Sequence, residues 1–191
     1  MWSNAGSKPG DVLFLTKPLG TGVVGTAIKF DRVDRSVADE AVRSMRTLNR
    51  AAAEALQALP AGVVHACTDV TGFGLIGHST EVAIASHVTV VLEVARVPLF
   101  DGVLPLVGQN RSGGMVSNEE HYRGGVQVDP GIPPDLLSLL FDPQTSGGLL
   151  IAADSQAADA VASALDAAGV RASRIGHAQP STQGVRVVVR P

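Results

Sequence analysis

A chain of 191 residues, 45% of them hydrophobic, can bury the core of one globular domain. Its formal net charge of −3 and the lack of any run of Lys or Arg argue against nucleic acid as a partner. Its single cysteine, Cys67, excludes an internal disulfide and a cysteine-based zinc site.

The first third of the chain contains two short elements and one long one. The apolar run GDVLFLT at 10–16 predicts a strand, and VVGTAIKF at 23–30 predicts a short helix. Between 36 and 59, apolar residues recur at steps of three and four, as on one face of a helix. We therefore expect one long helix over 36–59, capped near Ser36 and ended by Pro60.

The rest of the chain alternates less regularly between strands and helices. In chain order we expect a strand at 62–70, a helix at 72–86, strands at 87–97 and 125–129, a helix at 134–142, a strand at 147–153, a helix at 155–169, and strands at 172–178 and 184–190. Residues 98–134 are rich in Pro and Gly, which favours loops and a short helix. Gly169 is placed to cap its helix, and the last two strands are expected to form a hairpin around QPSTQG.

This order lacks a strict alternation of strand and helix, so it predicts an α+β fold. We expect a mixed β-sheet of about four to six strands covered by helices. The helices at 36–59, 72–86 and 155–169 should pack on the sheet. Residues 1–11 lack the charged start and apolar run of a signal peptide, and no apolar stretch approaches ~20 residues. A cytoplasmic location with no membrane span is therefore expected.

The segment TDVTGFG at 68–74 is the first candidate for chemistry. Asp69 falls where a predicted strand gives way to a predicted helix, a common place for ligands in layered folds. A carboxylate there can hold Mg²⁺ against phosphate oxygens, and glycines let a phosphate approach the backbone. The alternative is a helix cap, because Asp and Thr are common in that role. A single carboxylate is also too few ligands, so a metal at Asp69 would need other acids from elsewhere.

Other polar segments are less specific. FDPQTSGG at 141–148 could bind an oxyanion through its hydroxyls or be a tight loop. KPLGTG at 17–22 could cradle a phosphate, although it lacks the order of residues in a P-loop. Cys67 lies in a hydrophobic strand, where a free cysteine is usually a buried apolar residue. His78 could face Asp69 or pack in the core, and the five histidines show no metal-ligand spacing.

Taken together, these segments resemble one family. LTKPLGTGVV, HACTDVTGFGLIGH, a GG pair followed by Asn118, DPQTSGGLLI and RIGHA occur in the order and at the spacing of the C-terminal half of selenophosphate synthetases (selenide, water dikinases). The resemblance runs from about Gly10 to about Ala178. Shorter versions of the motifs occur in related ATP-using enzymes, which include aminoimidazole ribonucleotide synthetase, thiamine-monophosphate kinase and a hydrogenase-maturation protein.

The resemblance implies a reaction in which ATP, selenide and water give selenophosphate, AMP and orthophosphate. It also implies a fold like the C-terminal domain of the aminoimidazole ribonucleotide synthetase superfamily, with ATP and Mg²⁺ bound between two domains. Asp69 matches the aspartate that this domain contributes to the metal cluster. Thr71 and Gly72 match its neighbours at the phosphates.

The resemblance further implies that residues 1–191 are one domain of a two-domain enzyme that tends to form homodimers. The N-terminal domain, with the catalytic Cys or selenocysteine and the other metal aspartates, is absent from this sequence, so we expect no ATP turnover by the chain alone. Lys17, Asn118 and Thr145–Gly148 match family motif positions without an assigned role. Two alternatives remain open: a free-standing ligand- or partner-binding module, and the equivalent domain of a related ATP-using enzyme.

Overall fold

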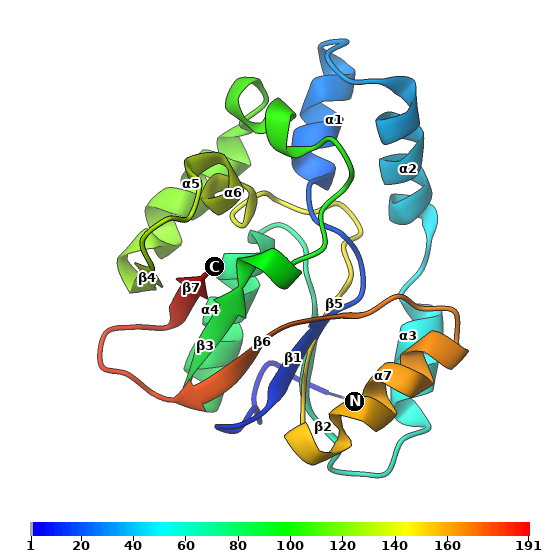
Figure 1. Ribbon diagram of the computed structural model, residues 1–191, viewed down its shortest axis with the longest axis vertical. Helices are drawn as coiled ribbons and strands as arrows, with labels where there is room; N and C mark the ends of the chain where they lie inside the picture. The colour runs from blue at the N-terminus through cyan, green and yellow to red at the C-terminus, as the bar shows by residue number, and fades with distance from the viewer. Residues whose placement is uncertain (1) are drawn as a thin grey trace.

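The computed structural model describes residues 2–191, which form one seven-stranded sheet with helices on both faces (Figure 1). Neighbouring strands follow the order β2-β5-β1-β6-β3-β7-β4. The strands are β1 Val12–Leu15, β2 Val64–Asp69, β3 Val88–Glu93, β4 Val126–Val128, β5 Leu149–Ala153, β6 Ser173–Pro180 and β7 Val187–Arg190. β3 and β4 each pair in parallel with β7, whereas the other pairs are antiparallel. The predicted α+β fold with a mixed sheet is confirmed, with seven strands instead of about four to six.

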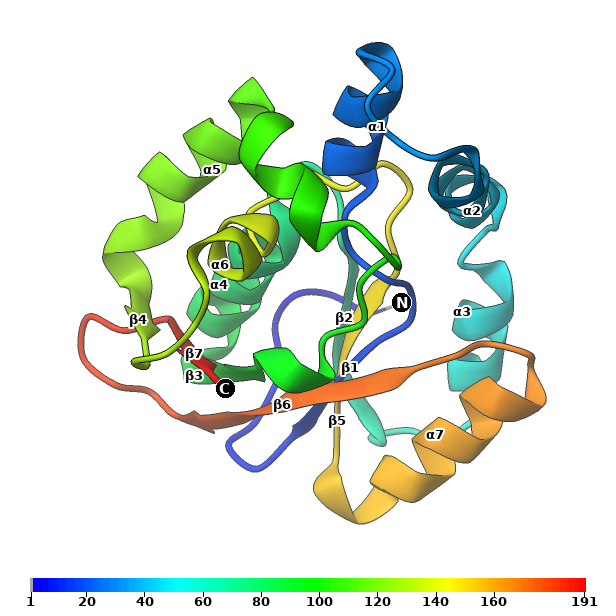
Figure 2. The ribbon, with the colours of Figure 1, turned by 45° about the horizontal axis from the view of Figure 1, so that its top comes forward.

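Side chains of the central strands alternate between two core clusters, one on each face of the sheet. In β1, Leu13 and Leu15 belong to the first core cluster and Phe14 to the second, as the period of two in a strand requires. Figure 2 shows α3 and α7 on one side of the sheet and α4, α5 and α6 on the other. The helices are α1 Thr21–Lys29, α2 Arg35–Arg46, α3 Arg50–Gln57, α4 Gly74–Ser86, α5 Gly113–Tyr122, α6 Pro134–Leu139 and α7 Ala158–Ala167.

The prediction of one long helix over 36–59 is wrong, because the structure divides this segment into α2 and α3. Ala41 of α2 is buried in the first core cluster, whereas Leu56 of α3 is buried in the second. One straight helix cannot place a single apolar stripe against opposite faces of a sheet. The chain therefore turns at Thr47, which has an extended ψ of 120°. Leu48, at the turn, is 75% exposed.

The predicted hairpin of the last two strands is also wrong, because β6 and β7 are not neighbours. β3 lies between them and pairs antiparallel to β6 and parallel to β7. Five of the six residues of β3 are buried, and pairing on both sides satisfies the backbone groups of such a strand. The segment after β6 therefore crosses β3 before it returns as β7.

The predicted helix ends are wrong at the start of α2 and correct at the end of α7. Ser36 lies inside α2, which begins after Asp34 without a side-chain cap. Gly169 follows α7 with a φ of +72° and confirms the predicted helix stop. The Pro- and Gly-rich segment 98–134 contains the ten-residue helix α5 in addition to short 3₁₀ turns. Within residues 2–191, no helix is both long enough and apolar enough to span a bilayer.

Candidate functional site

Asp69 is the last residue of β2 and its side chain is exposed. The next residue, Val70, is fully buried, and its N–H donates to the carbonyl of Gly148 at 2.8 Å. The chain is therefore anchored directly after Asp69, while the carboxylate itself projects from the end of the strand. Water, a cation or another protein surface can reach this carboxylate.

α4 begins at Gly74, five residues after Asp69, and its first turn is capped at one point, where the N–H of Ile76 donates to the carbonyl of Leu140 at 3.0 Å. Phe73 occupies the cap position, and no side chain bonds to the first turn. The N–H of Gly74 donates to the carbonyl of Thr71 at 3.1 Å. In the described part of the chain, the N–H groups of Gly72 and Phe73 have no hydrogen-bond acceptor. Free N–H groups at the positive end of a helix dipole attract anions, so this turn can receive a phosphate oxygen.

Hydrogen bonds from three parts of the fold fix the backbone of the turn at Thr71 and Gly72. His78 of α4 accepts a hydrogen bond at Nε2 from the N–H of Thr71 at 2.9 Å. Asn118 of α5 donates from Nδ2 to the carbonyl of Gly72 at 2.9 Å. The N–H of Gln144 donates to the carbonyl of Thr71, also at 2.9 Å. The motif residues Asn118 and His78, whose roles the sequence left open, therefore fix the backbone beside Asp69.

The segment 141–148 caps α1 from a distance of more than a hundred residues along the chain. The fully buried carboxylate of Asp142 accepts at Oδ2 from the N–H groups of Gly22 and Val23, at 2.9 and 3.2 Å. Gln144 accepts at Oε1 from the N–H of Gly20 at 3.0 Å. Asp142 and Gln144 of this loop therefore form a structural cap for the start of α1.

Lys17 is a cross-link within the fold. Its ammonium donates to the carbonyls of Ser44, Thr47 and Ser146 at 3.1, 2.6 and 2.8 Å. Burial lowers the pKa of this group. All three ammonium donors are used, and the N–H groups at the start of α1 are already capped. The segment 17–22 is therefore not available as a phosphate cradle, and Lys17 instead ties the end of α2 to the 145–148 loop.

Cys67 is partly buried, not fully buried as the sequence suggested, and its thiol is not activated. Burial, with a further contribution from the charge of Asp69, raises its pKa to about 12. A thiol with that pKa stays protonated at neutral pH. It lacks the thiolate character that a nucleophile needs.

The ionisation of the buried Asp142 predicts how the stability of the fold changes with pH. Burial raises its pKa from 3.8 to about 6, against the hydrogen bonds from Val23, Gln144 and Gly22. The folded protein therefore binds this proton more tightly than the unfolded chain does. This contribution to stability is complete below pH 4 and is lost as the pH rises through 6.

Relative to an Asp142→Asn variant, the free energy of unfolding of the unaltered chain should fall by about 2 kcal/mol between pH 4 and pH 7. Urea unfolding of both proteins at several pH values measures the difference, and Asp166→Asn serves as an exposed control. Parallel pH curves for the unaltered chain and Asp142→Asn would contradict the expected ionisation.

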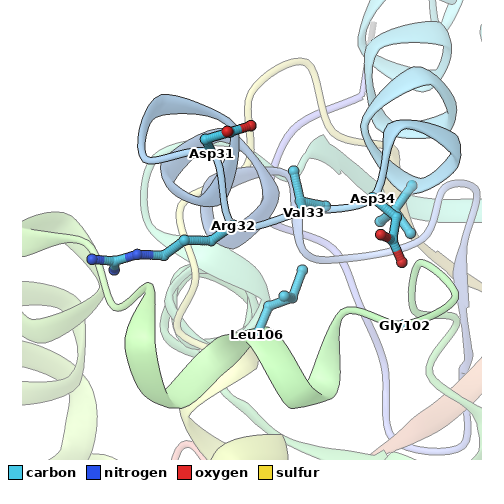
Figure 3. Close-up of a pocket in the computed structure, with 7 residues that line it drawn as sticks. Asp31, Arg32, Val33, Asp34, Gly102 and Leu106 are labelled. Carbon is cyan, nitrogen blue, oxygen red and sulfur yellow. The ribbon is translucent and has the colours of Figure 1, made fainter.

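Among residues 2–191, no further metal-ligating side chains gather around Asp69, and the cavity described below lies elsewhere. No three His, Cys, Asp or Glu side chains among residues 2–191 are grouped so that they could hold one metal ion. A cavity of about 300 Å³ lies between the α1–α2 turn and the segment around Leu106 (Figure 3). Asp34 points into the space beside Gly102, whereas Arg32 points away and donates to the carbonyl of Gln109 at 3.0 Å. This cavity does not include Asp69.

Comparison with known proteins places this geometry in a family. The family described as AIR synthase related protein, C-terminal domain, matches residues 8–189. The chain is 43% identical to the selenide, water dikinase of Myxococcus xanthus (strain DK1622) and 45% identical to that of Geobacter metallireducens (strain ATCC 53774 / DSM 7210 / GS-15). Each match covers 97% of this chain and 53% of the relative. The chain thus spans about half the length of the curated relatives it matches, and the predicted resemblance is confirmed.

Solved structures with the same fold have more distant sequences. Thiamine-monophosphate kinase from Stenotrophomonas maltophilia K279a is 16% identical with a TM-score of 0.67, and the match covers 97% of this chain and 52% of that one. The hydrogenase maturation protein HypE of E. coli is 21% identical with a TM-score of 0.65, and the match covers 97% and 48%. At this level of identity the likeness concerns the fold alone. The chain belongs to the family of AIR synthase related proteins, as their C-terminal domain.

Proposed function

We propose that this chain is the C-terminal half of a selenide, water dikinase, which makes selenophosphate, AMP and orthophosphate from ATP, selenide and water. In this proposal it forms one wall of the ATP site. The N-terminal half of the enzyme is its partner and supplies the catalytic Cys or selenocysteine. We also propose a homodimeric, cytoplasmic enzyme.

The observation that carries the proposal is the exposed carboxylate of Asp69 beside the free N–H groups of Gly72 and Phe73. Mg²⁺ prefers carboxylate and phosphate oxygens and is bound by one or two carboxylates together with substrate phosphates. A helix N-terminus favours the phosphate itself. One carboxylate and the two free N–H groups that precede α4 would therefore be half of a magnesium–nucleotide site.

Each residue then has a defined task. Asp69 would be a ligand of Mg²⁺, and the N–H of Gly72 and the side chain of Thr71 would face the phosphates. The backbone N–H and carbonyl of Thr71 are already bonded to His78 and Gln144. Mg²⁺ would neutralise charge that develops on the transferred phosphoryl group. Asn118 and Gly148 hold this turn through hydrogen bonds with Gly72 and Val70. Lys17 in turn fixes the Thr145–Gly148 loop by donating to the carbonyl of Ser146. Splitting the ligands between two halves allows domain closure to assemble the site around ATP.

The proposal is tested by restoring the second half. The part of the Geobacter metallireducens relative that this chain does not cover is joined to residues 1–191, and AMP formation from ATP is measured with and without selenide. We expect selenide-dependent AMP formation by the joined protein and none by the chain alone. A joined protein that folds but forms no AMP, beside an active intact relative, would contradict the proposal, as would turnover by the chain alone.

A further inference from the structure

His78 is a buried histidine whose ring lies directly behind the turn that follows Asp69. We infer that His78 is a positioning residue for the proposed nucleotide site: its neutral imidazole accepts the N–H of Thr71 and thereby fixes the backbone between Asp69 and Gly72. The inference rests on the proposed function for its effect on ATP. Its structural part can be measured on this chain alone.

The hydrogen bond defines the state of the ring. Nε2 lies 2.9 Å from the N–H nitrogen of Thr71 and 3.2 Å from its Oγ1. A backbone N–H can only donate, so Nε2 must be the acceptor and the single ring proton must be on Nδ1. A protonated imidazolium would set two donors against each other at this contact. Only the neutral ring with its proton on Nδ1 fits the geometry.

The surroundings of the ring favour this neutral state. The residue is 7% exposed, and burial lowers the pKa of His78, against opposing contributions from the charges of Asp69 and Glu81. Phe73 packs against the ring with centroids 5.4 Å apart, and the rings of Phe73 and Tyr122 form a T-shaped pair with centroids 6.0 Å apart. The aromatic contacts hold the ring where Nε2 can face Thr71.

The bond matters because of the peptide group it holds. The peptide joining Val70 to Thr71 is fixed at its N–H by His78. At its carbonyl it is packed so closely against Gly147 that a Cβ there would lie 2.1 Å from the oxygen. With this peptide fixed at both ends, the next N–H groups, of Gly72 and Phe73, stay without internal acceptors. His78 thereby fixes the position of the N–H groups of Gly72 and Phe73 relative to the Asp69 carboxylate.

The first test uses the isolated chain and needs no activity. Nitrogen-15 NMR of the unaltered chain at neutral pH should show His78 with its proton on Nδ1 and an acceptor nitrogen at Nε2. In a His78→Phe variant, amide hydrogen exchange at Thr71 should be at least about tenfold faster, because the N–H loses its acceptor. A His78→Gln variant should restore slow exchange, since Oε1 of glutamine can accept at the position of Nε2.

The second test uses the joined protein. His78→Phe should raise the KM for ATP by about tenfold and change kcat less, because the turn is displaced while the reacting groups remain. His78→Gln should recover most of that loss. His177→Phe is the matched control, since His177 lies on β6, with β1 and β5 between it and β2, and should leave the KM unchanged.

The outcomes separate this inference from the proposed function. A proton on Nε2 of His78, or unchanged exchange at Thr71 in His78→Phe, overturns the positioning role whether or not the joined protein is active. An unchanged KM in an active His78→Phe protein also overturns it. Loss of AMP formation in the unaltered joined protein contradicts the proposed function instead. The tautomer is measured on the unaltered chain, so it decides the question even if a variant does not fold.

Discussion

Replacing Asp69 by asparagine in the joined protein is expected to lower the rate of selenide-dependent AMP formation by about a thousandfold. Asparagine keeps the size and one oxygen of the side chain but removes the charge that a cation requires. Asp69 is exposed at the end of β2, so the substitution should leave the melting temperature of the isolated chain unchanged. Steady-state AMP formation at saturating ATP and Mg²⁺ measures the effect.

A matched control separates a site effect from a general loss of negative charge. Asp166 is an exposed aspartate on α7, which packs against the second core cluster. Asp166→Asn should retain the activity of the unaltered protein. If Asp69→Asn were as active as Asp166→Asn, Asp69 would not be a metal ligand. If Asp69→Asn unfolded, its role would be structural.

Replacing Gly147 by alanine is expected to lower the free energy of unfolding by about 3 kcal/mol or more. The added Cβ would lie 2.1 Å from the carbonyl oxygen of Val70 and 3.0 Å from Cβ of Gln144. Val70 cannot easily move away, because its N–H donates to the carbonyl of Gly148 at 2.8 Å. Urea unfolding of the isolated chain measures the loss.

Gly25→Ala provides the comparison for this second prediction. Gly25 lies within α1, and a Cβ there would meet no atom within 4 Å. Alanine at an open helical position should stabilise the chain by roughly 0.5–1 kcal/mol. Equal unfolding energies for Gly147→Ala and Gly25→Ala would show that the 141–148 loop can yield, and that it does not fix the backbone next to Asp69.

Local patterns in the sequence were sufficient for most individual elements. The apolar runs around Phe14 and Ile151 and the stop at Gly169 correspond to real strands and a real helix end. The division of 36–59 into α2 and α3 could not be predicted, because it depends on which face of the sheet each half covers. The position of β3 between β6 and β7 likewise depends on long-range pairing that the final two strands alone do not specify.

In the candidate site, too, the features that depend on long-range contacts could not be predicted from the sequence. The exposed end of β2 at Asp69 follows from the strand-to-helix transition, which can be read from residues 62–86. The tasks of Asp142 and Gln144 could not be read in this way, because they bond to α1 some 120 residues earlier in the chain. One signal was present: α1 begins after Gly20, which has no side chain to cap it. A helix with no local cap needs its acceptors from elsewhere in the fold.

We expect Asp69 to belong to a cation site that the other half of the enzyme completes. Crystals of the joined protein grown with Mn²⁺ and a non-hydrolysable ATP analogue would locate the metal by its anomalous scattering. A Mn²⁺ ion should be coordinated directly by a carboxylate oxygen of Asp69, with analogue phosphate oxygens among its other ligands. A metal–nucleotide complex bound wholly by the added half, with Asp69 in contact only with water, would contradict it.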